Sequence, residues 1–410
     1  MDKDLHSLQT PALVLDEARL DANCDGFIAR ARGLGVSLRP HVKTAKSVEV
    51  ARRACGGAAG PITVSTLREA EHFAAAGFSD ILWAQAITPD KFGRLFALPE
   101  TITVVTDEPA VARALARAAA DAGRRQSVLI EIDCGEHRSG LLPDDPRLLE
   151  VGRALAGDLA VRSPARLRAG ARRGPDEAAG AAETPGADKR QETAAAAGTR
   201  LAGVMTHAGH SYAQSTHEGM RRIAQAERQA VLAAAGRLRG AGLPCPIISV
   251  GSTPTFRYGD DFTGITEVRA GVYVFYDLSQ AMRHVCDRDE IALTVLSTVI
   301  GHNRQAGRLL LDAGGLALSK DLGANADGHP GYGELTDLAG HRLGLAITTV
   351  YQEHGVVEVA DETVFERHPV GSRVRILPNH ACMTAAGGYD GYHVLRGGGI
   401  GAIWPRFNGW

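Results

Sequence analysis

The sequence predicts an α/β protein in which a (β/α)8 barrel of the TIM type is followed by a β-rich domain. Two observations support this prediction. Eight short apolar runs alternate with amphipathic segments up to about residue 271 of the 410-residue chain, and closely spaced strand-like runs follow. Such alternation is typical of a parallel sheet covered by helices, and eight strands close a barrel. An open doubly wound sheet alternates in the same way, but no GxGxxG follows an early run.

The apolar runs are short and rich in β-branched residues, which favours strands. Most segments between them have helical periodicity, for instance the Ala- and Arg-rich stretches 66–77 and 108–123. The eight predicted barrel strands are 36–42, 62–65, 80–85, 101–106, 127–133, 201–207, 247–252 and 266–271.

The residue pattern changes after residue 285, where strand-like runs are no longer separated by helical segments. We therefore assign 1–285 to the barrel domain and 286–410 to the β-rich domain. Runs such as 291–302 and 372–383 are strand-like and are separated by Gly and Asp turns. Within the barrel, 162–199 is dominated by Ala, Gly, Arg, Glu and Pro, which predicts a disordered, low-complexity surface insertion. A basic interaction arm is the alternative, but the mixed charge of this stretch favours a plain insertion.

Composition and charge exclude several classes of function. The formal net charge of −2 gives no electrostatic basis for binding nucleic acid or an anionic membrane. No apolar run approaches the roughly 20 residues that span a bilayer, and the N-terminus lacks the pattern of a signal peptide. The six cysteines are far apart without a CxxC, which predicts reduced thiols. We therefore expect a cytoplasmic protein.

Polar residues follow the predicted barrel strands, at the end where barrels of this kind have their active sites. Lys43 follows the first strand within RPHVKTAKS. A lysine that attacks a carbonyl must first lose its proton, which burial and positive neighbours favour. A solvated loop lysine is the simpler interpretation of Lys43 taken alone. His137 and Arg138 follow the fifth strand, and Thr206 and His207 follow the sixth.

Two further motifs indicate an anion site and a metal site. SVGSTPT (249–255) follows the seventh strand with small residues whose backbone N–H groups suit a phosphate, although ordinary turn chemistry explains it equally well. Arg269 and Gly271 lie beside it in VRAGVYVFYD (268–277). In ILPNHACMT (376–384), His380 and Cys382 are two apart and share one face of a strand, and both are zinc ligands. Thiolate and imidazole favour zinc over magnesium or calcium.

Taken in order, PHVKT, GEHRSG, THAGHSY, SVGSTPT, EVRAGVYVFYD and PNHAC resemble the D-serine dehydratase branch of the pyridoxal-phosphate enzymes. This branch has a barrel of the alanine racemase type and is related to the D-threonine aldolases. The resemblance extends from about residue 10 to the closing FNGW. It implies pyridoxal 5'-phosphate and Zn²⁺, or another divalent metal such as Mn²⁺ or Co²⁺, as cofactors, and a homodimer as the assembly.

The resemblance also implies roles for individual residues. Lys43 would bind the cofactor aldehyde covalently and then remove the α-proton of the substrate. Arg138 would lie near the phenolic oxygen of the cofactor, and Arg269 near its pyridine nitrogen. His380 and Cys382 would bind the metal. The remaining implied cofactor contacts are Tyr212 and Tyr273 in the pocket and Gly251, Ser252, Thr253, Gly271 and Val272 at the phosphate.

The implied reaction is dehydration of a D-3-hydroxy amino acid, such as D-serine or D-threo-3-hydroxyaspartate, to a 2-oxo acid and ammonia. The cofactor would acidify the α-carbon, and the metal would stabilise the departing hydroxide as a Lewis acid. One alternative is an aldolase that releases glycine and an aldehyde, although aldolases of this group tend to have His-x-Asp where this chain has His380 and Cys382. A cofactor carrier without turnover is the other, but carriers lack a second domain.

Overall fold

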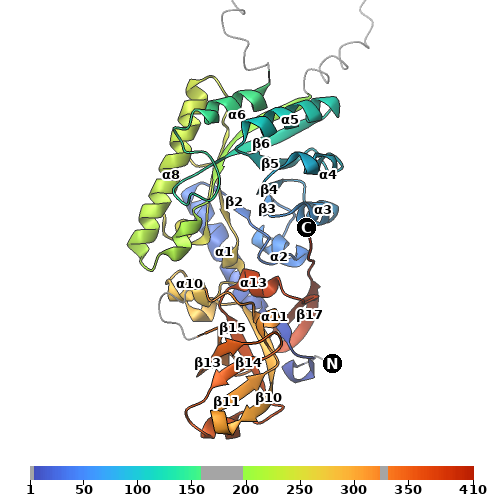
Figure 1. Cartoon of the computed structure of the whole chain (residues 1–410), viewed down its shortest axis with the longest axis vertical. Helices are drawn as coiled ribbons and strands as arrows, with labels where there is room; N and C mark the ends of the chain where they lie inside the picture. The colour runs from blue at the N-terminus through green and yellow to red at the C-terminus, as the bar shows by residue number, and fades with distance from the viewer. Residues whose placement is uncertain (1–3, 158–196, 324–330) are drawn as a thin grey trace, which may run out of the picture.

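The computed structural model describes residues 4–157, 197–323 and 331–410, and these form two sheet domains joined end to end (Figure 1). In the first domain, eight parallel strands are ordered β2-β9-β8-β7-β6-β5-β4-β3. A parallel bridge between His41 and Thr63 joins the two ends of this order and closes the barrel. The strands are β2 (Ser37–Pro40), β3 (Ile62–Val64), β4 (Ile81–Ala86), β5 (Ile102–Thr106), β6 (Arg125–Ile132), β7 (Gly198–Thr206), β8 (Ile247–Val250) and β9 (Glu267–Ala270).

Each predicted barrel strand overlaps one of these eight strands, so the barrel prediction is confirmed. The helices follow from local sequence in the same way. In α5 (Pro109–Asp121), proline occupies the first turn, where its missing N–H costs nothing, and Ala112, Leu115 and Ala119 bury one face. The covering helices are α1 (Glu17–Leu34), α2 (Val48–Ala54), α3 (Leu67–Ala75), α4 (Phe92–Phe96), α5, α6 (Arg147–Ala156), α8 (His217–Gly240) and α9 (Thr253–Tyr258).

The second domain is a mainly antiparallel sheet of nine strands, ordered β11-β14-β13-β12-β15-β10-β1-β16-β17. An additional pairing of β11 with β10 closes six of them into a small barrel. The strands are β11 (Arg308–Leu311), β14 (Gly355–Glu358), β13 (Arg342–Val350), β12 (Gly333–Thr336), β15 (Arg373–Pro378), β10 (Leu293–Asn303), β1 (Ala12–Asp16), β16 (Gly391–Arg396) and β17 (Gly399–Pro405).

The barrel domain does not begin at residue 1 as predicted, because β1 belongs to the sheet of the second domain. This strand pairs with β10 and β16 of the second sheet, because its alternating leucines are buried there, and the chain enters the barrel only through α1. The predicted insertion at 162–199 lies outside the described residues except for its last three, of which Gly198 and Thr199 begin β7. No helix in the described ranges is long and apolar enough to cross a bilayer.

The two domains are held together beside the first barrel loop. The Tyr392 hydroxyl of β16 donates to the Ala45 carbonyl at 2.6 Å. The C-terminal tail then returns to the barrel, where the Phe407 N–H donates to the Lys46 carbonyl at 3.1 Å and the Phe407 ring stacks on His72. Figure 1 shows the C-terminus beside α3. These contacts place the second domain against the C-terminal ends of the barrel strands.

Candidate active site

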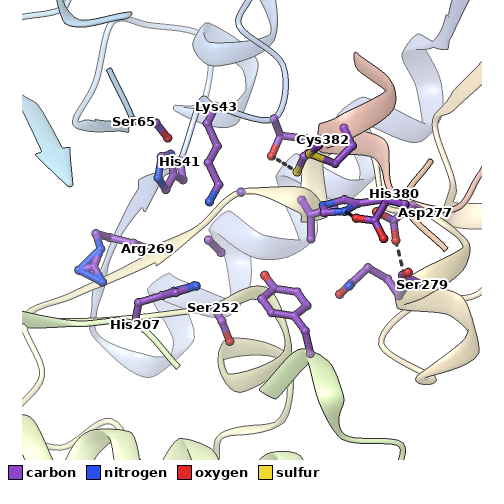
Figure 2. A pocket seen from close by; sticks show the side chains of 18 of the residues that line it. His41, Lys43, Ser65, His207, Ser252, Arg269, Asp277, Ser279, His380 and Cys382 are labelled. Carbon is purple, nitrogen blue, oxygen red and sulfur yellow. Dashed lines mark hydrogen bonds and ion pairs between the residues drawn. The ribbon is translucent and has the colours of Figure 1, made fainter. Parts of the chain in front are cut away.

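A cavity of about 580 Å³ lies between the C-terminal ends of the barrel strands and the second domain. Figure 2 shows its side chains, with the Lys43 amine pointing inward from the barrel and His380 and Cys382 on the opposite, second-domain side. More than 300 sequence positions separate Lys43 from His380 and Cys382, and the fold brings all three to the walls of one cavity. The predicted site residues that line it are Lys43, Tyr212, Ser252, Arg269, Gly271, Val272, His380 and Cys382.

Lys43 is held by the turn that follows β2. The His41 N–H donates to the Ala270 carbonyl of β9 at 2.7 Å, and the Val42 N–H donates to Thr63 at 2.9 Å, so both neighbouring strands anchor the loop. The Lys46 N–H donates back to the Val42 carbonyl at 2.8 Å, which closes the turn around Lys43. The amine is therefore presented from a rigid backbone, as a reacting group requires.

Two neutral histidines flank Lys43. Burial lowers the pKa of His41 well below its ordinary value and lowers the pKa of His207 to about 3, and the nearby charge of Lys43 lowers both pKa values further. His207 Nδ1 lies 2.7 Å from the Gly251 carbonyl, which can only accept, so Nδ1 carries the proton and Nε2 is an acceptor. Both rings thus add polar surface to the cavity without adding charge.

Arg269 forms the barrel floor of the cavity and is fixed by a buried network. Its guanidinium donates to the Thr206 carbonyl and, at 3.0 Å, to the Ser249 hydroxyl. That hydroxyl in turn donates to Glu267 at 2.7 Å, and Glu267 also pairs with Arg39 at 2.9 Å. Buried carboxylates near Arg269 therefore balance the charge of its guanidinium, and the hydrogen bonds to Thr206 and Ser249 fix the orientation of that group.

The predicted phosphate cradle has a shape and a donor set that fit an anion. Ser252, Gly271 and Val272 line the cavity, and the neighbouring Thr253 hydroxyl is buried with no hydrogen-bond partner among the described residues. An anionic oxygen would satisfy that hydroxyl. The Gly251 N–H, in contrast, donates to the buried Glu227 carboxyl at 2.9 Å. We therefore assign Gly251 a conformational role in the cradle and not a donor role.

The conformation of Gly251 excludes a side chain. Its φ is +145°, and a Cβ there would collide with the Arg269 carbonyl oxygen of the adjacent strand. Gly251→Ala is expected to destabilise the fold by several kcal/mol, on the order of the largest single-site effects, and to weaken cofactor binding. Thermal unfolding measures the first effect and cofactor titration the second. Gly236→Ala, on the exposed face of α8 with open space around it, is the control and should be neutral or slightly stabilising.

Four of the predicted cofactor contacts are not among the described residues that line the cavity: Gly251 and Thr253, which adjoin Ser252, and Arg138 and Tyr273. The Arg138 side chain is 55% exposed and lies 3.5 Å from Glu136. The Tyr273 side chain is fully buried and stacks on Phe27 with the ring centroids 4.0 Å apart, so it packs the barrel against α1. Only the backbone of Tyr273 remains adjacent to the cradle, through Val272. These placements give no support to a side-chain contact with the cofactor for Arg138 or Tyr273.

The predicted metal pair has the donors and the supporting contacts of a metal site. His380 Nδ1 lies 2.6 Å from Asp321 Oδ2, which orients the ring and leaves Nε2 for a metal. The Thr44 hydroxyl lies 3.1 Å from Cys382 Sγ. Burial opposes both charges, but Cys382, Asp277 and Asp321 raise the pKa of His380 to about 10, and His380 lowers the pKa of Cys382. Each member of the pair therefore favours the charged form of the other, and a divalent metal would take the place of the proton between them.

The His380–Cys382 pair supplies only two protein ligands for a metal among the described residues. The described ranges contain no group of three or more His, Cys, Asp or Glu side chains placed to hold a metal ion. Two protein ligands leave coordination positions for water and substrate, whereas structural zinc sites use four. His380 and Cys382 could therefore hold a metal whose remaining positions are filled by water or substrate.

Sequence reasoning missed several residues of this cavity. Asp321 and Asp277 support the metal pair, and Ser279, Gln280 and Arg283 extend the wall beside it. Asp277 closes the EVRAGVYVFYD motif, which was a local signal for it. The others lie in segments without a motif, 59 positions from His380 in the case of Asp321, and only the fold brings them together.

Comparison with known proteins agrees with this architecture. The family model "Alanine racemase, N-terminal domain" matches residues 15–163 and 179–279, and "Putative serine dehydratase domain" matches residues 292–395. D-threo-3-hydroxyaspartate dehydratase from Delftia sp. is 40% identical over the full length of both chains. The solved structure of that enzyme superposes with a TM-score of 0.86, again covering both chains completely.

More distant relatives include enzymes of both reaction types. D-serine dehydratase from Dictyostelium discoideum is 28% identical over 96% of this chain and 95% of its own. D-threonine aldolase from Arthrobacter sp. is also 28% identical, over 98% of this chain and 92% of its own. The predicted barrel of the alanine racemase type with a β-rich second domain is confirmed. The chain belongs to the family of D-serine and 3-hydroxyaspartate dehydratases, pyridoxal-phosphate-dependent lyases.

Proposed function

We propose that the protein is a pyridoxal-phosphate- and zinc-dependent dehydratase of D-3-hydroxy amino acids, such as D-threo-3-hydroxyaspartate or D-serine. The observation that supports this most directly is the shared cavity of Lys43 and the His380–Cys382 pair. Removal of an α-proton and departure of a β-hydroxide occur on adjacent carbons, so a base and a Lewis acid must face one substrate from different sides. Lys43 and the metal pair have this arrangement.

The barrel residues hold the cofactor and move the α-proton. Ser252, Gly271 and Val272 would bind the phosphate, and Arg269 would line the floor of the cofactor pocket. Pyridoxal phosphate, when bound, supplies the electron sink that acidifies the α-carbon. We assign this proton to the Lys43 amine, because burial lowers the pKa of both His41 and His207 and makes them poor bases.

The second-domain residues act on the β-hydroxyl. His380 and Cys382 would hold a divalent metal, which would supply Lewis-acid stabilisation to the departing hydroxide. Asp321 orients His380, and Thr44 positions Cys382 from the barrel side. The unsaturated amine that is released hydrolyses to a 2-oxo acid and ammonia, which balances the reaction without an oxidant.

Retro-aldol cleavage is the second candidate, because aldolases are among the relatives at 28% identity. Incubation of the enzyme with D-threonine separates the two reactions by their products. We expect 2-oxobutyrate and ammonia, measured with lactate dehydrogenase coupling and an ammonia assay. Glycine and acetaldehyde in equal amounts would instead identify an aldolase. Enzyme pretreated with chelator is the control, since either reaction should then decline.

A further inference from the structure

A buried carboxyl group lies directly behind the predicted phosphate cradle, and the mechanism does not use it. Glu227, on α8, is 2% exposed, and its Oε1 accepts the Gly251 N–H at 2.9 Å. We propose that Glu227 is a positioning residue for the cofactor phosphate: its uncharged form directs the Ser252 hydroxyl, through Thr255, to donate into the cradle. This inference rests on the proposed function only for the identity of the cofactor.

Two hydroxyl groups connect Glu227 to the cavity. The Thr255 hydroxyl is hydrogen-bonded to the Glu227 carboxyl, and Thr255 Oγ1 lies 2.9 Å from Ser252 Oγ. Ser252 lines the cavity on its barrel side (Figure 2). The Thr255 N–H donates to Ser252 Oγ and the Ser252 N–H donates to Thr255 Oγ1, both at 3.2 Å. The backbone thus fixes the two oxygens, and only the directions of their protons are free to change.

An ionised Glu227 draws these protons away from the cavity. A carboxylate can only accept, so it takes the proton of the Thr255 hydroxyl. Thr255 Oγ1 then needs the Ser252 proton, because two oxygens 2.9 Å apart repel each other without a proton between them. Ser252 would therefore face a bound phosphate with lone pairs and not with a donor.

An uncharged Glu227 reverses this order. Its carboxyl O–H donates to Thr255 Oγ1, the Thr255 hydroxyl donates to Ser252 Oγ, and the Ser252 hydroxyl is left to donate into the cavity. The Ser211 hydroxyl, 2.9 Å from Ser252 Oγ, can donate to that oxygen in both states. One proton on Glu227 thus becomes one donor to the phosphate, and only the rotation of two hydroxyl groups is required.

The surroundings of Glu227 allow both charge states near neutral pH. Burial raises the pKa of Glu227 to about 7, although three hydrogen-bond donors and the Arg269 charge favour the ionised form. Arg269 faces Glu227 from β9, and Cys134 faces it from the loop after β6. Burial, and next Glu227, raise the pKa of Cys134 to about 12, so this thiol stays neutral. β7, β8 and α9 present only uncharged N–H and O–H groups to the carboxyl.

A bound phosphate would shift this equilibrium toward the uncharged form. The phosphate brings negative charge to the other side of the cradle, and a like charge nearby favours protonation of a carboxylate. Binding of the phosphate therefore takes up a proton at Glu227. The affinity for the phosphate group should be high below the pKa of Glu227 and should fall as the pH rises above it.

The test separates the phosphate contact from the rest of cofactor binding. Absorbance titration of the cofactor-depleted, full-length protein gives the dissociation constants of pyridoxal phosphate and of 5'-deoxypyridoxal, which has the same ring and aldehyde without the phosphate. The ratio of the two constants measures the preference for the phosphate. In the wild type this preference should fall about tenfold or more from about pH 6.5 to about pH 9, as for loss of a charge-assisted hydrogen bond.

Two variants should remove this pH dependence at opposite levels. Glu227→Gln stays uncharged, so its preference for the phosphate should remain high over the whole range. Ser252→Ala lacks the final donor, so its preference should remain at the low alkaline level of the wild type. Glu218→Gln removes an exposed carboxylate from the first turn of the same helix and is the matched control, which should follow the wild type.

Opposite levels would not result from a merely structural role, because damage to the cradle would lower the preference in both variants. A wild-type preference that does not change with pH would overturn the inference, as would a Glu227→Gln preference that falls with pH like that of the wild type. Should Glu227→Gln fail to fold, the wild-type profile and Ser252→Ala still decide. If the wild type binds neither compound, the proposed function itself fails, which is a separate result.

Discussion

Lys43→Ala is expected to abolish dehydration and the visible absorbance of the bound cofactor, with the fold intact. Loss of a positioned proton acceptor alone lowers turnover by about 10²–10⁴-fold, and loss of the covalent link to the cofactor adds to this. Steady-state assay of ammonia release measures the first effect and the absorption spectrum the second. The fold should persist, because the Lys43 side chain lies in the cavity and makes no hydrogen bond or ion pair with any described residue.

Two further measurements sharpen this test. Lys91→Ala removes a half-buried lysine outside the cavity and should leave both the spectrum and the rate unchanged. Small primary amines added to Lys43→Ala should restore part of the turnover if the missing group is a base. Turnover retained in Lys43→Ala without added amine would exclude the role assigned to this lysine.

Cys382→Ala is expected to remove dehydration while the cofactor stays bound. The metal would lose its thiolate ligand, whereas the phosphate cradle lies on the barrel and is untouched. We expect a loss of about 10²-fold or more in ammonia release, together with loss of bound metal by elemental analysis and an unchanged cofactor spectrum. Chelation of the wild-type enzyme should reproduce the same phenotype, and added Zn²⁺ should reverse it.

Cys55→Ala is the matched control for Cys382→Ala. Cys55 is a half-buried thiol at the end of α2 and is not part of the cavity wall, so its replacement should retain both metal and activity. Full activity of Cys382→Ala, or of chelated enzyme shown to be free of metal, would remove the metal from the mechanism. The proposed base chemistry of Lys43 would survive that result.

The amino-acid sequence by itself determined the barrel and its eight strands, and it indicated which candidate site residues would lie at one end of the barrel. Strand and helix periodicity are local properties, and the C-terminal ends of parallel strands must meet at one mouth, so Lys43, Ser252 and Arg269 were predictable as neighbours. The His-x-Cys spacing likewise indicated a metal pair without any knowledge of the fold.

Only the tertiary structure decided what surrounds these residues. Side-chain direction within a loop depends on distant contacts: Tyr273 turns to Phe27 of α1 while its neighbour Val272 faces the cavity, and nothing in their sequence separates them. The joining of β1 to the second sheet and the approach of Asp321 to His380 are also long-range events. Arg283 enters the site because backbone bonds join α10 (Leu278–Met282) to the strand end at Asn379, a pairing across about 100 residues that no local pattern encodes.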